Sequence, residues 1–210
     1  MKPKTVAIIG AGGRGTLFAD IIGEYGHLGK VVAVAEPKDD YRQSMATKHG
    51  VKKDMCFNTW QEFVARPKLC DAVVVATMDR EHVEPAVACL NKGYDMLLEK
   101  PMAPSLAECR AIEQAQRKSG GIVAVCHSLR YHKEFRKVRD LVASGAIGRL
   151  ITVDMVEGVA TWHQAHSFVR GNWGNEAKSA FMLLAKCCHD IDYLCFLTGQ
   201  PARYVSSFGS

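Results

Sequence analysis

The chain has 210 residues and a formal net charge of +5, and it is 48% hydrophobic and 23% charged. This composition is typical of a globular protein with room for one full domain and part of a second. Lysine and arginine are interleaved with aspartate and glutamate, which argues against nucleic-acid binding. No apolar run reaches the length of a membrane-spanning helix, so we expect no membrane association.

The eight cysteines form no Cys-x-x-Cys pair and no metal-ligand spacing, and most lie in apolar stretches. We therefore expect reduced, buried thiols and no bound metal. Residues Met1–Lys4 lead directly into an apolar run, which leaves no room for a signal peptide. These features together predict a cytoplasmic protein.

Apolar, β-rich runs alternate with helix-like stretches over residues 1–126. This alternation predicts an α/β domain with a doubly wound parallel sheet, the Rossmann type, because helices must cover both faces. The predicted strands are Thr5–Ile9, Val31–Ala35, Ala72–Ala76, Met96–Leu98 and Ile122–Val125. The predicted helices are Leu17–Tyr25, Tyr41–His49, Val83–Asn91 and Leu106–Lys118.

A second domain is predicted over residues 127–210, where the character of the chain changes. Its expected elements are a helix at Phe135–Ser144, a strand at Ile151–Val159, a polar loop from Thr161 to Asn175, a helix at Phe181–Leu197 and a strand-like run at Ala202–Phe208. One strand and the start of another are too few to cover a sheet. We therefore expect the beginning of an open-sheet α/β domain in a C-terminally incomplete chain.

A glycine-rich turn follows the first predicted strand. It reads Gly10-Ala11-Gly12-Gly13-Arg14-Gly15. In a dinucleotide-binding turn the first glycine permits the tight bend, the second admits the pyrophosphate, and the third allows close packing of the helix. Such turns also occur as plain connections, so the motif alone is weak evidence.

An acidic residue, Glu36, ends the second predicted strand. A carboxylate at this position can accept hydrogen bonds from both ribose hydroxyls, and it repels a 2′-phosphate. NAD is therefore favoured over NADP, although Lys38 or Arg42 could soften that preference. The alternative is that Glu36 merely caps the turn before Pro37.

The segment Glu99-Lys100-Pro101 closes another apolar strand, at the edge of a parallel sheet where ligands gather. Pro101 restricts the backbone, so the Lys100 side chain is aimed and can exchange a proton. Upstream, Thr77 and His82 follow a strand and are placed to line the same cleft. Without this context Lys100 would be an ordinary surface lysine.

These segments, followed by a His-Asp pair in a later helix, resemble the glucose–fructose oxidoreductase, inositol dehydrogenase and rhizopine catabolism (Gfo/Idh/MocA) family over essentially the whole chain. The resemblance implies a Rossmann domain that binds NAD or NADP, and a second domain that holds a sugar-like substrate and makes homo-oligomer contacts. It also implies catalytic roles for Lys100 near the nicotinamide and for His189 as acid/base. Many members carry an aspartate where this chain has Ala185, which is a departure from the family pattern.

Several polar residues of the second domain are expected to face the substrate. On the last helix, Lys186, His189, Asp190 and Tyr193 share one face, and Asp190 or Asp192 could orient the His189 ring. The loop before it carries Trp162, His163, His166, Ser167, Arg170, Asn172 and Trp173, which suit a polyol. The predicted substrate-binding residues are Arg130, Tyr131, His163, His166, Arg170, Trp173, Lys186 and Asp190.

Other interpretations of these residues remain open. His189 could be a structural histidine at a domain seam, the loop could be an interface, and His163, His166 and His189 could form a metal site, though without an acidic partner nearby. The leading hypothesis is an NAD-dependent oxidoreductase that transfers hydride between nicotinamide and a hydroxyl-bearing carbon of a sugar or cyclitol. The alternatives are an NAD-dependent glycosidase or lyase, and an NAD-binding protein without catalysis. The predicted cofactor-binding residues are Gly10, Gly12, Gly13, Arg14, Gly15, Glu36, Thr77, His82, Glu99 and Lys100.

Overall fold

The computed structural model describes residues 2–171, 173–175, 177 and 179–208, and it divides into two compact units. The first unit comprises Met1–Cys126 together with Asn175–Ala180. The second unit comprises His127–Gly174 and Phe181–Ser210. The chain therefore enters the second unit, returns briefly to the first and leaves it again. No helix in the described residues is long and apolar enough to cross a membrane.

The first unit is built on a parallel sheet of six strands in the order β3-β2-β1-β4-β5-β6. This is the strand order of a doubly wound dinucleotide-binding fold, and it confirms the predicted fold class. The strands are β1 Lys4–Ile9, β2 Gly29–Ala35, β3 Cys56–Phe57, β4 Ala72–Val75, β5 Asp95–Leu98 and β6 Val123–Val125. Strand β3 was not predicted, because two residues are too few to show a periodicity.

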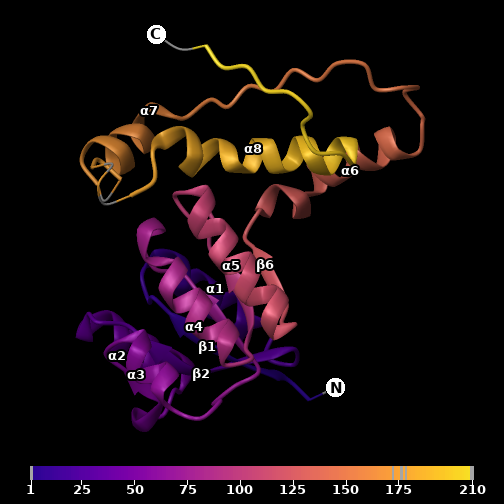
Figure 1. Ribbon diagram of the computed structural model, residues 1–210. Coiled ribbons are helices and arrows are strands. Elements are labelled where there is room, and N and C mark those ends of the chain that lie inside the picture. The colour runs from indigo at the N-terminus through magenta and orange to yellow at the C-terminus, as the bar shows by residue number, and fades with distance from the viewer. Residues whose placement is uncertain (1, 172, 176, 178, 209–210) are drawn as a thin grey trace. The chain divides into compact units, whose positions relative to one another are not determined.

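Five helices of the first unit flank the sheet in Figure 1. They are α1 Gly13–Glu24, α2 Asp39–His49, α3 Trp60–Ala65, α4 Val83–Asn91 and α5 Leu106–Ser119, with short 3₁₀ turns η1 Lys53–Met55 and η2 Asp79–Glu81. Helix α3 escaped prediction although a capping box marks its start. The Thr59 hydroxyl accepts from the backbone N–H of Glu62, and the Glu62 carboxylate accepts from that of Asn58.

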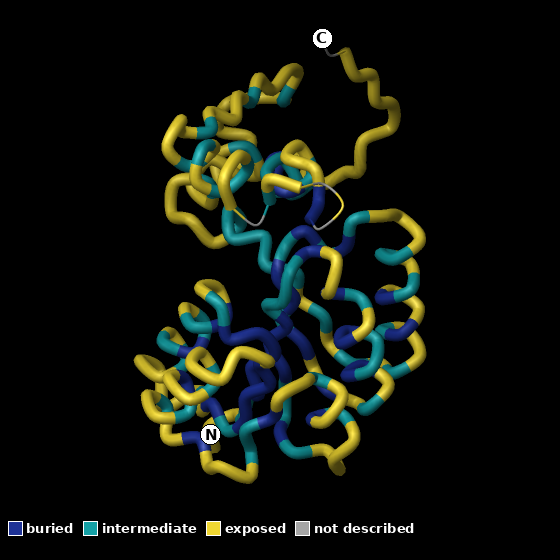
Figure 2. Tube along the Cα trace, turned by 90° about the vertical axis from the view of Figure 1, so that its left-hand side faces the viewer, coloured by how far each residue is buried: buried dark blue, intermediate teal, exposed yellow. Residues whose placement is uncertain are grey.

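Alternate residues of the central strands are buried on opposite faces of the sheet. On β4, Val73 and Val75 pack in one cluster with side chains of α3, α4 and α5, whereas Val74 packs in the other with side chains of α1 and α2. Figure 2 shows these strands as a buried centre of the first unit. Because both faces are covered, the strands read as continuous apolar runs in the sequence.

The segment Asn175–Ala180 is fastened to turn η2 by two hydrogen bonds. The Asp79 carboxylate accepts from the backbone N–H of Ala180 at 3.1 Å, and Arg80 Nε donates to the carbonyl of Ser179 at 3.0 Å. Ser179 and Ala180 are both buried. The chain is thus anchored to the first unit immediately before it begins its last helix.

The second unit is largely helical where it is regular. Its elements are η3 Ser128–Tyr131, α6 Lys133–Ala143, α7 Thr161–His163, the π-helical η4 Gln164–Val169 and α8 Met182–Thr198. Helices α6 and α8 are joined by Tyr193, whose hydroxyl donates to the Phe135 carbonyl at 3.0 Å and whose ring meets the Phe135 ring edge-on.

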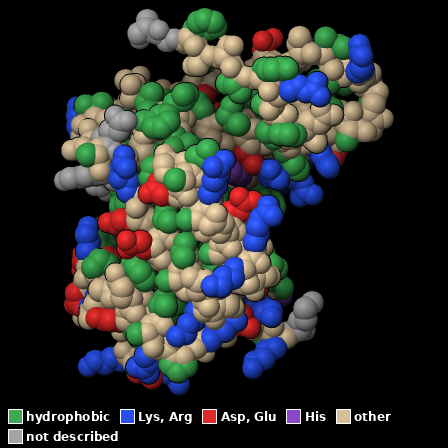
Figure 3. Space-filling model, in the orientation of Figure 1, with side chains coloured by type: hydrophobic (Ala, Val, Ile, Leu, Met, Phe, Trp, Pro, Cys, Tyr) green, Lys and Arg blue, Asp and Glu red, His purple; other side chains and the backbone are tan. Residues whose placement is uncertain are grey.

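Two predicted strands of this unit are wrong. Residues 151–159 and 202–208 have no strand assignment, and α7 with η4 occupies much of the predicted loop Thr161–Asn175. A strand needs a hydrogen-bonded neighbour, and these runs are largely exposed: Val156 is 91% exposed and Phe208 97%. On α8, the apolar side chains Met182 and Leu183 are exposed as well. Figure 3 accordingly shows many hydrophobic side chains at the surface of the second unit.

Candidate functional site

The carboxyl ends of the parallel strands bring together most of the predicted cofactor-binding residues. The glycine turn follows β1, Glu36 follows β2, Thr77 lies just beyond β4, and Glu99 follows β5. Strands β1 and β4 are neighbours in the sheet although they are not consecutive in the sequence. This is the topological switch point, where ligands bind in doubly wound sheets.

Two glycines of the turn are required by close backbone contacts. Gly10 has a φ of +89°, and a Cβ there would lie 2.6 Å from the Ala76 carbonyl oxygen. A Cβ on Gly15 would lie 1.9 Å from the Gly10 carbonyl oxygen. By contrast, a Cβ on Gly12 or Gly13 would meet nothing within 4 Å. The turn is therefore packed against the protein at Gly10 and Gly15, and open at Gly12 and Gly13, where α1 begins.

Glu36 is buried and fastened to the glycine turn. Its Oε2 accepts from the backbone N–H of Ala11 at 2.7 Å, and its Oε1 accepts from that of Lys38 at 2.9 Å. A carboxylate has about four acceptor positions, so each oxygen can accept a further hydrogen bond. Glu36 thus does more than cap the turn before Pro37: it joins the loop after β2 to the loop after β1.

Arg42 and Lys38, the two cations that could weaken the preference for NAD over NADP, both contact other protein groups. Arg42 donates from Nη1 to the Glu36 carbonyl at 2.5 Å and pairs through Nη2 with Asp39. The Lys38 ammonium lies over the Tyr41 ring. Neither side chain is held in place as a ready receptor for a phosphate.

Arg14 connects the glycine turn to the Glu99-Lys100-Pro101 segment. Its Nε donates to Glu99 Oε1, and Glu99 Oε2 accepts from the backbone N–H of Lys100 at 2.8 Å. Glu99 is 4% exposed, so the ion pair is shielded on one side. Lys100 is half-buried, and the Lys100–Pro101 peptide is cis. Two hydrogen-bonding contacts hold the backbone beside the Lys100 amine: that of the Lys100 N–H with Glu99 and that of the Pro101 carbonyl with His82.

Cys126 completes this cluster as a neutral thiol. Arg14 Nη2 lies 3.6 Å from its sulfur. Burial raises the pKa of the Cys126 thiol, and the charge of Glu99 raises it further, while Arg14 works in the opposite direction. The thiol is thus kept protonated beside the ion pair.

His82 joins two of the loops at this edge. The ring is 1% exposed, with Nδ1 2.9 Å from the Pro101 carbonyl oxygen and Nε2 3.2 Å from that of Thr77. The Thr77 hydroxyl in turn donates to the Glu81 carbonyl. Both ring nitrogens of His82 face backbone, so its geometry is that of a group that positions the cofactor-side loops.

In the second unit, the side chains of the predicted polar face of α8 differ in how far they are buried. Asp190 and Tyr193 are buried, whereas Lys186 and His189 are half-buried. Lys186 Nζ lies 2.8 Å from His163 Nε2 and over the Phe168 ring. The structure thus brings together Lys186 and His163, two of the residues predicted to bind substrate.

Other residues predicted to face substrate are placed differently. Arg130 makes a bidentate ion pair with Asp192, which also contacts His127. Tyr131 is 75% exposed, and Trp162 is exposed and stacked on His163. His166 lies in η4, and Arg170 and Trp173 follow it in the chain; Asn172 lies outside the described residues.

His127 was missed by sequence reasoning. It follows the last strand of the sheet by two residues, a position that the other strand ends could have flagged. Asp190 or Asp192 was expected to orient the His189 ring, and in the structure the Asp192 carboxylate contacts His127 and Arg130. No group of three or more metal-ligating side chains is found within the described residues.

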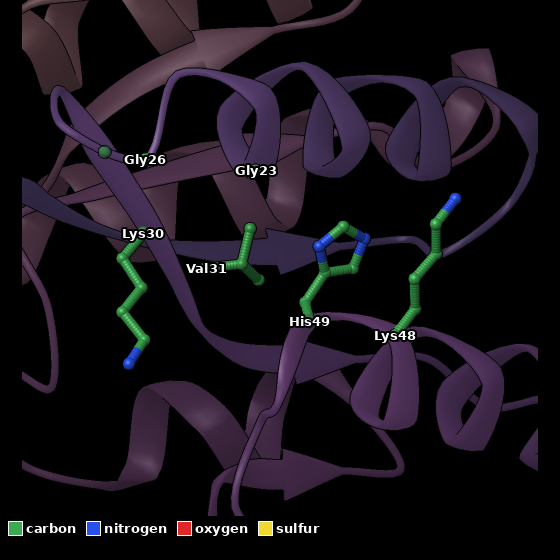
Figure 4. Close-up of a pocket in the computed structure, with 7 residues that line it drawn as sticks. Gly23, Gly26, Lys30, Val31, Lys48 and His49 are labelled. Atoms are coloured by element: carbon green, nitrogen blue, oxygen red, sulfur yellow. The ribbon is translucent and has the colours of Figure 1, made fainter.

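A cavity in the first unit lies away from this site. Figure 4 shows its lining, which includes Lys30, Lys48 and His49, and its volume is about 270 Å³. It sits beside the beginning of β2 and the ends of α1 and α2, where helix carbonyls point. Asp20 already pairs with both Lys48 and His49. None of the predicted cofactor residues lines it.

Comparison with known proteins gives a match for each part of the chain. Residues 4–127 match the family described as "Oxidoreductase family, NAD-binding Rossmann fold", and residues 135–210 match the "GFO/IDH/MocA C-terminal domain". A 1,5-anhydro-D-fructose reductase from Ensifer adhaerens is 32% identical over 85% of this chain and 52% of its own length. An inositol 2-dehydrogenase from Salmonella paratyphi B is 28% identical over 85% of this chain and 50% of its own length. The chain thus spans about half the length of these relatives.

Solved structures share the fold at lower sequence identity. The myo-inositol 2-dehydrogenase of Lactobacillus plantarum has a TM-score of 0.79 and 22% identity, over 94% of this chain and 57% of its own. The WlbA dehydrogenase of Bordetella pertussis, solved with NADH and UDP-GlcNAcA, has a TM-score of 0.78 and 20% identity, over 93% of this chain and 58% of its own.

Proposed function

Because the chain belongs to the Gfo/Idh/MocA family of oxidoreductases, we propose that it transfers hydride between NAD and a hydroxyl-bearing carbon of a sugar or cyclitol. The main support is the edge of the sheet where the glycine turn, Glu36, Thr77 and Glu99-Lys100 meet. The names of two relatives, an inositol dehydrogenase and an anhydrofructose reductase, support a polyol or sugar as substrate.

The residues at this edge fit a dinucleotide. The surface over Gly12 and Gly13 is open at the start of α1, where backbone N–H groups can receive a pyrophosphate. Glu36 keeps acceptor capacity for ribose hydroxyls while its position is fixed by Ala11 and Lys38. Because Arg42 is engaged by Glu36 and Asp39, a 2′-phosphate would meet the Glu36 carboxylate without a dedicated cation. NAD is therefore preferred over NADP.

Bound NAD would supply the hydride acceptor, and the chain's own groups handle the proton. The Lys100 amine is proposed to exchange the proton of the substrate hydroxyl, since Glu99 and Pro101 fix the backbone on either side of it. His189 is proposed as the second acid/base group, because an imidazole passes protons near neutral pH. The substrate hydroxyls would be held by Lys186 and by the loop residues His163, His166, Arg170 and Trp173.

One observation favours a second candidate, an NAD-binding protein without catalysis. Ala185 is 1% exposed on α8, at the position where the family resemblance implies an aspartate in many members. A methyl group would then stand in place of a substrate-binding carboxylate. In this case the cofactor would bind and no substrate would turn over.

The test combines cofactor binding with turnover. NADH fluorescence titration should show binding, and a panel of sugars and cyclitols with NAD should reveal net NADH formation. Lys100→Ala should lower kcat about 100-fold or more, as loss of a general acid/base does, with NADH affinity within about fivefold. Lys118→Ala, an exposed lysine at the end of α5, is the control and should match the parent.

The outcomes separate the candidates. Binding without turnover on any substrate supports the non-catalytic protein, and substrate conversion without net NADH supports a lyase or glycosidase. Equal turnover in Lys100→Ala and the parent would refute the role given to Lys100.

A further inference from the structure

Three side chains of the second unit form an ion-paired cluster beside His189. Arg130 donates to Asp192 through Nε and Nη2, each at 2.7 Å. His127 Nδ1 lies 2.9 Å from Oδ1 of the same carboxylate. The His127 ring then meets the His189 ring edge-to-face, with centroids 5.9 Å apart. Asp192 is thereby linked to His189 through His127.

The ion-paired cluster is held on one side by α8 and on the other by the segment that carries His127 and Arg130. His189, Asp192 and Phe196 are three and four residues apart on α8, so they lie along one side of the helix. The Arg130 guanidinium lies 5.0 Å from the centre of the Phe196 ring, in addition to its two bonds with Asp192. Arg130 is on η3 and His127 directly precedes it, so both partners come from one short segment. The carboxylate has little freedom to leave this arrangement.

The Asp192 side chain remains ionised in this setting. Burial opposes its charge, but the hydrogen bond from Arg130 and the charges of His127 and Arg130 outweigh burial and lower the pKa of the carboxyl. An ionised carboxylate can only accept hydrogen bonds. The proton between His127 Nδ1 and Asp192 Oδ1 must therefore be bonded to His127 Nδ1.

We propose that His127, held by Asp192 with its proton on Nδ1, is a positioning residue that fixes the ring of His189. The catalytic consequence of this role rests on the function proposed above, in which His189 is an acid/base group. Asp192 and His189 on α8 both contact His127, and Arg130 on η3 pairs with the same Asp192 carboxylate. Removal of the His127 ring leaves the Arg130–Asp192 pair in place but takes away the ring that His189 packs against.

The first experiment needs no turnover. In the full chain with ¹⁵N-labelled histidine, long-range ¹H–¹⁵N correlations report which ring nitrogen carries the proton. We expect neutral His127 to be the Nδ1–H form, and Asp192→Ala to shift it to the Nε2–H form. His127→Gln should move the His189 ring signals, whereas His132→Gln should not, because His132 is exposed and its ring meets the Phe135 ring. An Nε2–H form in the parent, or His189 signals unchanged in His127→Gln, overturns the proposal.

The second experiment adds the catalytic consequence. With a substrate found by the panel above, His127→Gln should lower kcat about tenfold and change the pH profile, with the KM for NAD unchanged. Asp192→Asn should resemble it, and Asp192→Glu should recover part of the loss. Identical kinetics of His127→Gln and His132→Gln would overturn the positioning role. A parent chain without turnover counts against the proposed function, and the histidine spectra still decide the role of His127.

Discussion

The two units fix their polar residues in different ways. In the first unit, Glu36, His82 and Glu99 are at most 8% exposed, and each contacts backbone groups. Glu36 and His82 contact the backbone of a neighbouring loop, whereas Glu99 accepts from the backbone N–H of the next residue, Lys100, and pairs with the Arg14 side chain. In the second unit, the polar contacts run between side chains, as in Arg130–Asp192–His127 and Lys186–His163. Backbone groups at the end of a covered sheet have one position, whereas paired side chains depend on one another's charge and rotamer.

This difference predicts how each unit responds to change. The cofactor edge should be formed before any ligand binds, and backbone clashes should be the most damaging changes there. The second unit should respond to changes in charge and pH. The following variants test that contrast.

The largest effect is expected at Gly15. In Gly15→Ala the new Cβ would lie 1.9 Å from the Gly10 carbonyl oxygen, so the turn must move as a whole. We expect a loss of about 1–3 kcal/mol in the free energy of unfolding, a Tm lower by about 5 °C, and NADH affinity weakened more than 100-fold. Thermal melting and fluorescence titration measure both.

Gly23→Ala is the matched control in the same helix. Its Cβ would lie 3.5 Å from His49 Nδ1, which is an ordinary contact, and alanine favours the helix by about 1 kcal/mol. Its Tm should equal or exceed that of the parent. If Gly15→Ala melts and binds like Gly23→Ala, the cofactor edge is not fixed by its backbone.

The next effect is expected at Glu36. Glu36→Gln keeps one side-chain acceptor but removes the charge that repels a 2′-phosphate. Loss of a hydrogen bond to a charged group costs about 1.5 kcal/mol, so we expect NADH affinity to fall about tenfold and the preference over NADPH to shrink. Asp40→Asn, an exposed acid nearby, is the control for charge alone and should change neither value. Unchanged discrimination in Glu36→Gln would remove Glu36 from the cofactor site.

The first unit could be predicted closely from the sequence because its signals are local and repeated. Strand β4 and helix α4 were located to within a residue, since apolar runs and covered faces follow from a parallel sheet. Gly10, Gly15 and Glu36 were located by their spacing, and the structure shows the contacts that demand the two glycines. What could not be predicted is that His82 faces two carbonyls, because those carbonyls lie five and nineteen residues away.

The second unit was harder to predict because its pattern depends on long-range partners. Ile151–Val159 alternates like a strand, yet pairing is decided by a neighbour and not by the run itself. Arg130 and Asp192 are 62 residues apart, and nothing local shows that they pair. The pairing of Arg130 with Asp192, and the contact of His127 with the same carboxylate, could therefore not be predicted.

The smallest effect is expected from pH in the second unit. The folded-state pKa of Asp192 is lowered, because Arg130 and His127 outweigh the cost of burial. A carboxyl whose pKa is lowered by folding stabilises the fold fully at pH values above its unfolded-state pKa of about 3.9. This stabilisation is lost as the pH falls through the lower folded-state pKa. The ion pair should contribute about 1 kcal/mol or less. Asp192→Asn should therefore lower Tm by a few degrees at pH 7 and by almost nothing near pH 2.5.

Asp140→Asn provides the comparison, since Asp140 pairs with Arg139 at 3.4 Å on an exposed part of α6. Its Tm should track the parent at both pH values. Thermal melts of the three proteins at pH 7 and near pH 2.5 give the difference directly. If Asp192→Asn loses as much stability in acid as at neutrality, the carboxylate acts through packing and not through charge, and the second unit would then resemble the first.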